Sequence, residues 1–256
     1  MERRSLLLLV TDLDGTVFGP NQPISTETKA AAALLRENDI GLTAATGRNE
    51  WEARELVEQM GITLPVILAS GAQIYDFRAE RLLYGKEFCR QTLLAFLEGL
   101  PGAGGLRIHW FDGTGWQSGS FREFQALGRA AVVQRVFLED PGSSLDLADG
   151  EDHPYWVFRQ GNLVELTPKE VHKGEGLMEL CRLLGIDPRE VTAVGDGAND
   201  LELLQTAGVG FAVAGGHVSL REAADAVTVS MEEHPLLKIA QWMVGRTPWE
   251  RIVMRA

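Results

Sequence analysis

An apolar run over residues 6–10 ends in two carboxylates, and this junction constrains the fold more than any other feature of the sequence. Four leucines and a valine in succession predict a buried strand. Asp12 and Asp14 follow two residues apart, so their side chains point to the same side of an extended chain. Gly15 then permits a tight backbone turn. Two carboxylates that converge at a strand end suit phosphoryl transfer, in which one attacks and the other moves a proton.

Strands alternate with helices in two separate stretches of the chain. In the first stretch, the predicted helices cover residues 26–38 and 51–60, and the strands cover residues 40–45 and 66–69. In the second, the helices cover residues 173–184, 199–207 and 236–244, and the strands cover residues 191–194, 210–213 and 226–229. This alternation predicts an α/β fold with a parallel sheet flanked by crossover helices.

The chain between residues 76 and 167 has a different pattern, richer in glycine and aromatic residues. Extended segments are predicted at residues 81–88, 106–116, 155–159 and 162–166, with Gln160 and Gly161 as a hairpin turn and helices at residues 91–97 and 121–130. We therefore expect an inserted α+β domain over residues 76–167, between two halves of a core domain at residues 1–75 and 168–256.

The composition narrows the classes of partner. The chain has 24 lysine and arginine residues against 36 aspartate and glutamate residues, a net charge of −12, which argues against a nucleic-acid partner. Its two cysteines, Cys89 and Cys181, lie far apart and have no metal-ligand spacing. No stretch approaches the roughly 20 apolar residues of a membrane span. We expect a cytoplasmic protein without a membrane partner.

Two further positions suit an anionic ligand. Thr46 and Gly47 end a predicted strand, where a hydroxyl and free backbone N–H groups can hold a phosphate oxygen. Lys173 begins a predicted helix and is one of five lysines in a chain with nineteen arginines, so a specific role for this ammonium group is favoured. Taken singly, each position also fits an ordinary turn or a solvated side chain.

A third group, Asp196, Asn199 and Asp200, follows the strand predicted at residues 191–194. Two carboxylates and an amide at a strand end make a hard-oxygen site suited to Mg²⁺. A Ca²⁺ loop is the alternative, but the segment lacks the repeated spacing and terminal glutamate of an EF-hand loop. Helix capping by Asn199 or Asp200 is compatible with metal binding. All of these groups fall at the sheet edge where ligands bind in parallel α/β folds.

Taken together, these segments resemble the four motifs of the haloacid dehalogenase superfamily of phosphohydrolases, in their order. The inserted domain resembles the type-two α/β cap of the subclass that includes Cof-like sugar phosphatases, sucrose-phosphate phosphatases and phosphomannomutases. Residues 45–48 and 165–168 are most similar to the sucrose-phosphate phosphatase branch. The resemblance implies a Rossmann-like core with an inserted cap.

It also implies roles for the residues that carry it. Asp12 would be the nucleophile that forms an aspartyl-phosphate, and Asp14 would protonate the leaving alcohol and then activate water. Thr46 and Lys173 would hold the phosphoryl oxygens. Further residues are implied to line the phosphate site: Gly15, Gly47, Arg48 and Asn199. Mg²⁺ would be bound by Asp12, Asp196 and Asp14, the last through its backbone carbonyl, with help from Asp200.

The cap is implied to select the substrate. Its polar and aromatic candidates are His109, Trp110, Asp112, Trp116, Arg122 and Tyr155. We expect a Mg²⁺-dependent phosphomonoesterase, a monomer or homodimer, that acts on a small phosphorylated sugar, such as a sucrose-6-phosphate-like disaccharide, or on a phosphorylated glycerate. The alternatives are a non-catalytic binding protein on the same fold and a phosphomutase whose cap holds a second phosphate through arginines, with candidates Arg107, Arg122, Arg129, Arg135 and Arg159.

Overall fold

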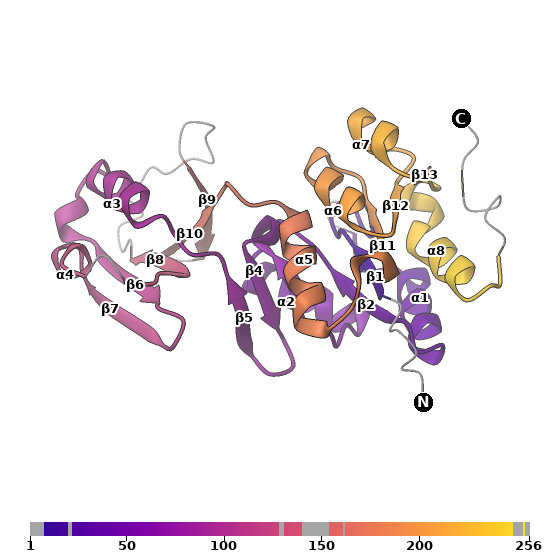
Figure 1. Cartoon of the computed structure of the whole chain (residues 1–256), viewed down its shortest axis with the longest axis horizontal. Coiled ribbons are helices and arrows are strands. Elements are labelled where there is room, and N and C mark those ends of the chain that lie inside the picture. Colours follow the sequence, from indigo (N-terminus) through magenta and orange to yellow (C-terminus); the bar gives the residue numbers. More distant parts are fainter. Residues whose placement is uncertain are drawn as a thin grey trace. The chain divides into compact units, whose positions relative to one another are not determined.

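The computed structural model describes residues 8–19, 22–127, 131–139, 154–160, 162–247 and 253. The chain divides into two compact units, one formed by Met1–Tyr84 with His172–Ala256 and the other by Gly85–Val171 (Figure 1). The units divide later in the chain than the predicted boundaries at residues 75 and 167. Two predicted features, the arginine at position 129 and the glycine of the predicted hairpin turn at position 161, lie outside the described residues.

A five-stranded parallel sheet forms the centre of the larger unit, in the order β13-β12-β11-β1-β2. The strands are β1 (Leu8–Thr11), β2 (Gly41–Ala44), β11 (Val191–Gly195), β12 (Val209–Ala212) and β13 (Ala226–Val227). Leu8 pairs with Gly41 on one side and Val191 on the other, so β1 is the middle strand. The residues that follow β1, β2 and β11 therefore emerge side by side at one edge of the sheet.

Helices cover both faces of this sheet, as the alternation of strands and helices predicted (Figure 1). The helices are α1 (Thr26–Glu37), α2 (Glu50–Met60), α5 (Lys173–Leu184), α6 (Leu201–Thr206), α7 (Val218–Ala223) and α8 (Pro235–Met243). Side chains of β1 alternate between two hydrophobic cores: Leu9 packs with α1, α2 and α8, whereas Leu8 and Val10 pack with α5 and α6. Burial on both faces explains why the sequence of β1 is apolar throughout.

A second, three-stranded sheet extends the larger unit, in the order β3-β4-β5. Its strands are β3 (Val66–Leu68), β4 (Gln73–Asp76) and β5 (Arg81–Gly85). β3 also lies beside the end of β2, because the N–H of Thr46, which follows β2, donates to the carbonyl of Ile67 in β3 at 2.9 Å. β4 was not predicted, and the segment predicted as an extended part of the inserted domain, residues 81–88, pairs instead with β4 and ends at Gly85.

The smaller unit is an antiparallel five-stranded sheet in the order β7-β6-β8-β10-β9, with two helices on one face (Figure 1). Its elements are α3 (Arg90–Glu98), β6 (Arg107–Phe111), β7 (Trp116–Ser120), α4 (Phe121–Gln125), β8 (Arg135–Glu139), β9 (Tyr155–Gln160) and β10 (Leu163–Pro168). Leu93, Leu97 and Phe124 of the helices pack on buried side chains of the sheet. The prediction that this segment has an α+β fold is confirmed.

The prediction of one continuous extended segment over residues 106–116 is wrong, because β6 ends at Phe111 and a turn leads into β7, which begins at Trp116. The Asp112 carboxylate accepts hydrogen bonds from the backbone of Thr114 and Gly115, at 2.9 Å each, and so closes the turn. The helix predicted at residues 121–130 ends at Gln125. Short 3₁₀ turns occur at Ala69–Gly71, Ala103–Gly105, Pro188–Glu190, Ala198–Asp200 and Met231–Glu233. Among the described residues, none of the helices has the length and apolar character needed to span a membrane.

Candidate active site

Asp12 follows β1 directly and occupies the middle of the sheet edge. Its N–H donates to the Val194 carbonyl of β11 at 2.8 Å, so its backbone still continues the strand. The side chain is only 7% exposed, and the Lys173 ammonium donates to its Oδ1 at 2.6 Å. Burial raises the pKa of Asp12 to about 7, and the negative charges of Asp200 and Asp196 act in the same direction, against the opposing effect of Lys173.

Lys173 is the first residue of α5 and is completely buried. Its Nζ donates to Asp12 and to Asp200, at 2.6 Å in both cases. Burial alone would lower the pKa of Lys173, but the two carboxylates outweigh it and raise that pKa. The ammonium is therefore a permanent positive charge between two carboxylates, and the solvated alternative for this lysine is wrong.

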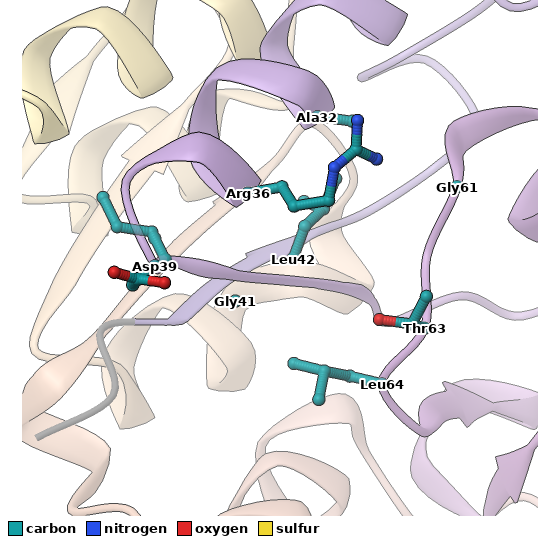
Figure 2. A pocket seen from close by; sticks show the side chains of 9 residues that line it. Ala32, Arg36, Asp39, Gly41, Leu42, Gly61, Thr63 and Leu64 are labelled. Atoms are coloured by element: carbon teal, nitrogen blue, oxygen red, sulfur yellow. The ribbon is translucent and has the colours of Figure 1, made fainter.

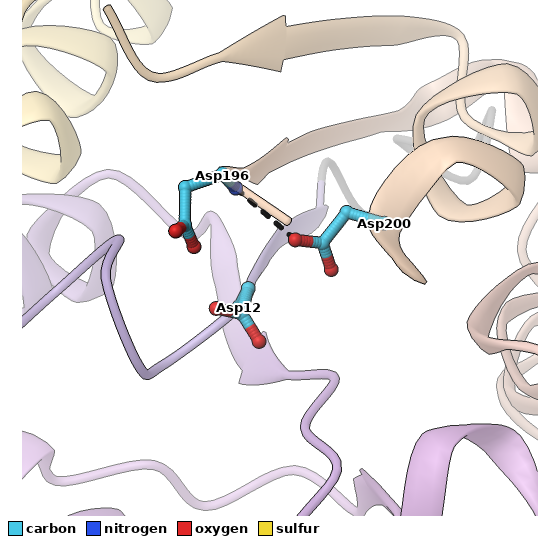
Figure 3. Close-up of side chains that lie close together, drawn as sticks. All are labelled: Asp12, Asp196 and Asp200. Atoms are coloured by element: carbon cyan, nitrogen blue, oxygen red, sulfur yellow. Dashed lines mark hydrogen bonds between the residues drawn. The ribbon is translucent and has the colours of Figure 1, made fainter. Parts of the chain in front are cut away.

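Asp196 and Asp200 follow β11 and face Asp12 (Figure 3). A carboxylate oxygen from each of these three residues lies within 4.8 Å of the others, a spacing that a metal ion could bridge. Asp200 uses both of its oxygens: Oδ1 accepts from Lys173, and Oδ2 accepts from the N–H groups of Asp196 and Gly197 at 3.1 and 3.0 Å. Asp200 therefore fixes the loop after β11 and the Lys173 side chain. The carboxylates of Asp12 and Asp196 accept fewer hydrogen bonds from the protein than that of Asp200.

The chemistry of this donor set fits a small divalent cation. Three carboxylates face a single ammonium, and burial raises the pKa of Asp196 as well as that of Asp12. Hard oxygen ligands with excess negative charge are what Mg²⁺ prefers. Gly15 has a φ of +81°, and a Cβ atom there would collide with the Asp196 carboxylate, so only glycine fits against this group.

Asp14 lies two residues beyond Asp12 and is not one of the three clustered carboxylates. The Asp14 carboxylate is 53% exposed and accepts two hydrogen bonds from Arg48, from Nε at 2.8 Å and from Nη2 at 2.6 Å. The side chain that was expected to contact phosphate, Arg48, is thus engaged with the expected acid–base residue. Binding of Mg²⁺ by the backbone carbonyl of Asp14 stays a prediction.

Thr46 closes the other side of the site, at the end of β2. It is completely buried, and its Oγ1 accepts from the Arg48 N–H at 3.1 Å, which leaves the hydroxyl hydrogen available to a phosphoryl oxygen. Gly47 follows it, close to the Ser70 hydroxyl. On the far side, Asn199 is an exposed residue of the turn after β11. Contact of Gly47 and Asn199 with phosphate stays a prediction.

Two residues of the larger unit that had no assigned role support this site. Thr16 Oγ1 donates to Asp196 Oδ1 at 2.9 Å and so fixes the direction of that carboxylate. Ser70 has a φ of +54°, which is rare for a residue with a side chain, and its N–H donates to the Thr46 carbonyl at 3.0 Å. Thr16 lies within the first motif, so its position was visible in the sequence, whereas the Ser70 backbone conformation carries no such signal.

The six aromatic and polar candidates of the smaller unit divide by burial. Trp110 and Tyr155 lie in its hydrophobic core, where Trp110 contacts Phe124 and Tyr155 contacts Phe88. Asp112 forms the β6–β7 turn. The remaining three are partly or largely exposed: His109, Trp116 and Arg122.

Two of the arginine candidates for a second phosphate, Arg135 and Arg107, lie near carboxylates. Arg135 is buried and donates to Glu165 Oε1 at 2.9 Å, while Arg107 lies 3.9 Å from Glu139. The Arg135 guanidinium also lies over the rings of Trp116 and Phe137. The Glu165 contact neutralises the buried Arg135, whereas the Arg107 side chain is 60% exposed.

A cavity of about 250 Å³ lies elsewhere in the larger unit, at the start of β2 (Figure 2). Arg36 and Asp39 from the end of α1, with Thr63 and Leu64 after α2, line it. It opens at the opposite end of β2 from Thr46 and contains none of the predicted site residues. The chemistry described above therefore belongs to the carboxyl edge of the sheet and not to this cavity.

Comparisons with known proteins agree with this geometry. The model of the haloacid dehalogenase-like hydrolase family matches residues 9–135 and 145–239. A phosphoglycolate phosphatase of Natronomonas pharaonis is 30% identical over 220 residues, which cover 86% of this chain and 90% of that protein. An HMP-PP phosphatase of Escherichia fergusonii is 26% identical over 240 residues, covering 84% of this chain and 86% of that protein.

The fold also has a solved counterpart. The structure of a subclass IIB sugar phosphatase of the haloacid dehalogenase superfamily superimposes with a TM-score of 0.58 at 20% identity, over 94% of this chain and 99% of that chain. That likeness establishes the shared architecture of core and inserted unit. With the family match over both halves of the core and the phosphatase relatives, we conclude that this chain is a phosphatase that belongs to the haloacid dehalogenase-like hydrolases.

Proposed function

We propose that the chain is a Mg²⁺-dependent phosphomonoesterase that works through an aspartyl-phosphate on Asp12. The observation that carries the proposal is the contact of Asp12 with Lys173, beside the carboxylates of Asp196 and Asp200. A carboxylate that attacks a phosphate ester must approach another anion, and a buried ammonium with a cation site lowers that repulsion.

The proposed reaction has two steps. In the first, an oxygen of Asp12 forms a bond to phosphorus, the ester P–O bond breaks, and Asp14 gives a proton to the leaving oxygen. In the second, Asp14 takes a proton from water, the water oxygen forms a bond to phosphorus, and the bond between phosphorus and the Asp12 oxygen breaks, which releases inorganic phosphate and free Asp12. Lys173 and the Thr46 hydroxyl hold the phosphoryl oxygens, and Lys173 also fixes Asp12.

Asp12 and Asp196 would hold Mg²⁺, and Asp200 supports the loop that carries Asp196. When bound, Mg²⁺ would neutralise charge on the transferring phosphoryl group. Thr16 keeps the Asp196 carboxylate directed into this position through its 2.9 Å hydrogen bond. Replacing Asp196 by asparagine would keep the shape of the loop and remove one of the charges that would hold the cation.

We further propose that the substrate is a small phosphorylated sugar or a related hydroxylated metabolite, whose organic part is selected by the smaller unit. Support comes from the sheet face opposite α3 and α4, where Phe111 pairs in register with Trp116 on one side and with Arg135 on the other. Trp116 is 51% exposed there, and aromatic faces beside polar groups suit a sugar ring. The names of the relatives also allow a phosphorylated small acid.

Phosphate release from a panel of esters tests both proposals. The panel contains hexose and disaccharide phosphates, phosphoglycerate, phosphoglycolate and p-nitrophenyl phosphate, with Mg²⁺ or with EDTA, and with Asp12→Asn in parallel. We expect release that requires Mg²⁺ and falls by at least about 1,000-fold in the variant, because the nucleophile is lost. No release from any ester would overturn the proposal and favour the non-catalytic alternative, and activation by a sugar bisphosphate would identify a mutase.

A further inference from the structure

Arg48 holds the expected acid–base residue in a two-point contact. The Nε and Nη2 atoms of Arg48 donate to different oxygens of the Asp14 carboxylate, at 2.8 and 2.6 Å. Two parallel, charge-assisted hydrogen bonds fix the plane of the carboxylate as well as its distance. Because the Asp14 side chain is 53% exposed, little other packing is available to fix its direction.

Four contacts hold the arginine itself. Its Nη1 lies 3.4 Å from the Glu52 carbonyl, and its guanidinium lies over the Phe18 ring at 5.5 Å from the centroid. Its backbone N–H donates to Thr46 Oγ1, and its carbonyl accepts from the Ala69 N–H at 2.8 Å. The paired oxygens of Asp14 also raise the pKa of Arg48, which strengthens its permanent charge. The guanidinium is thus a pre-oriented part of the loop after β2.

This arrangement differs from that of a phosphate-binding arginine. The Nε–Nη2 edge is an edge with which a guanidinium binds phosphate or carboxylate bidentately, and here Asp14 occupies it. The charge for the phosphoryl group is already supplied by Lys173, which is buried beside the nucleophile. The contacts of Arg48 therefore serve the acid–base group.

Building on the phosphatase function proposed above, we propose that Arg48 is a positioning residue that sets the direction of the Asp14 carboxyl. It acts on the transfer of a proton to the leaving alcohol and not on the binding of the phosphoryl group. The consequence is a dependence on the leaving group. A sugar alcohol needs a proton as it departs, whereas nitrophenolate leaves without one, so only the sugar ester depends on a well-directed Asp14.

The test compares Arg48→Met with wild type on a sugar phosphate and on p-nitrophenyl phosphate, both in saturating Mg²⁺. The quantity measured is kcat/KM, which covers the steps up to loss of the leaving group and excludes hydrolysis of the aspartyl-phosphate. A general acid is worth about 100- to 10,000-fold, so we expect a loss of roughly 10- to 100-fold on the sugar ester and less than about threefold on the aryl ester. The inhibition constant of inorganic phosphate should stay within about twofold of wild type, because the phosphoryl contacts are unchanged.

A double-mutant cycle with Asp14→Asn shows whether Arg48 acts through Asp14. On the sugar ester, the two changes together should cost no more than Asp14→Asn alone, because the group that Arg48 positions is already disabled. Arg48→Lys should retain part of the activity on this ester, since one ammonium replaces a two-point contact by a single one.

Arg54→Met is the matched control. Arg54 is 35% exposed against 32% for Arg48, pairs with Glu80 at 3.4 Å, and lies over the Phe77 ring. We expect wild-type kinetics from it on both esters.

Equal losses on both esters in Arg48→Met, additive losses in the cycle, or a weaker inhibition by phosphate would overturn the positioning role and assign Arg48 to phosphate binding. A wild-type enzyme that hydrolyses neither ester would instead overturn the proposed function. The two failures are therefore distinguishable.

Discussion

Buried charge dominates the site at the scale of single residues. Three carboxylates converge on one ammonium, and burial raises the pKa of Asp12 from 3.8 to about 7. The folded protein therefore binds a proton on Asp12 more tightly than the unfolded chain does. Stability from this group is complete below about pH 4 and is lost as the pH rises through about 7, because the buried carboxylate must then ionise.

This argument predicts that, when Mg²⁺ is absent, the free energy of unfolding of Asp12→Asn depends less on pH than that of the wild type. In EDTA, the free energy of unfolding of the wild type should fall between pH 5 and pH 8 by on the order of 2 kcal/mol more than that of the variant. Urea denaturation at the two pH values measures the difference, and added Mg²⁺ should reduce it. Parallel pH profiles for the two proteins would show that Asp12 ionises without cost in the folded state.

At the scale of elements, helix α5 begins with a sequence that is poor for a helix. Its first turn contains Gly174 and Gly176, and glycine costs about 1 kcal/mol relative to alanine inside a helix. The structure gives the reason: a Cβ atom on Gly176 would lie 2.6 Å from the Ile67 side chain and 2.9 Å from the Gly71 backbone. The helix approaches β3 closely here, and that approach places Lys173 against Asp12.

Gly176→Ala should therefore destabilise the protein although alanine is the better helix former. We expect a loss of roughly 1–3 kcal/mol from overpacking and a lower kcat, because α5 must shift and carry Lys173 with it. Thermal and urea unfolding measure the first effect, and turnover of p-nitrophenyl phosphate the second. The control is Gly104→Ala, where an added Cβ meets no atom within 4 Å; a stabilised Gly176→Ala would mean that helix propensity outweighs the close contact.

At the scale of the whole molecule, hydrophobic packing is divided between the two units. The clusters on either face of the parallel sheet contain only residues of the larger unit, and a third cluster contains only residues of the smaller one. Phe124 and Phe211 are equivalent probes of this division. Each is completely buried and contacts a tryptophan ring edge-on, Trp110 in the smaller unit and Trp242 in the larger.

We expect Phe124→Ala and Phe211→Ala each to cost about 3–5 kcal/mol in the unit that contains it. Hydrogen exchange followed by mass spectrometry locates the effect. Faster exchange should be confined to peptides from residues 85–171 in the first variant and to peptides outside that range in the second. Uniformly faster exchange in either variant would show that the two units unfold as one.

The features of the fold and of the site that could be predicted from the sequence are those that depend on residues close together in the chain. The positions of Asp12, Thr46, Lys173 and Asp196 at the ends of strands or the start of a helix follow from hydrophobic patterning, and the structure brings them to one edge. The pairing of Arg48 with Asp14 was not predictable, because it depends on side-chain directions in two turns that are far apart in the sequence. The β6–β7 hairpin was missed because its turn lies between aromatic residues that suit a continuous strand.

The spacing of the site along the chain has a consequence for synthesis. Lys173 and Asp12 are 161 positions apart, and Asp196 and Thr16 are 180 apart, with the smaller unit encoded between them. When only β1 and β2 have been synthesised, Asp12 is present but Lys173 and Asp196 are not. Activity therefore requires the pairing of β1 with β11, so the rate at which activity returns during refolding reports the rate at which the central sheet forms.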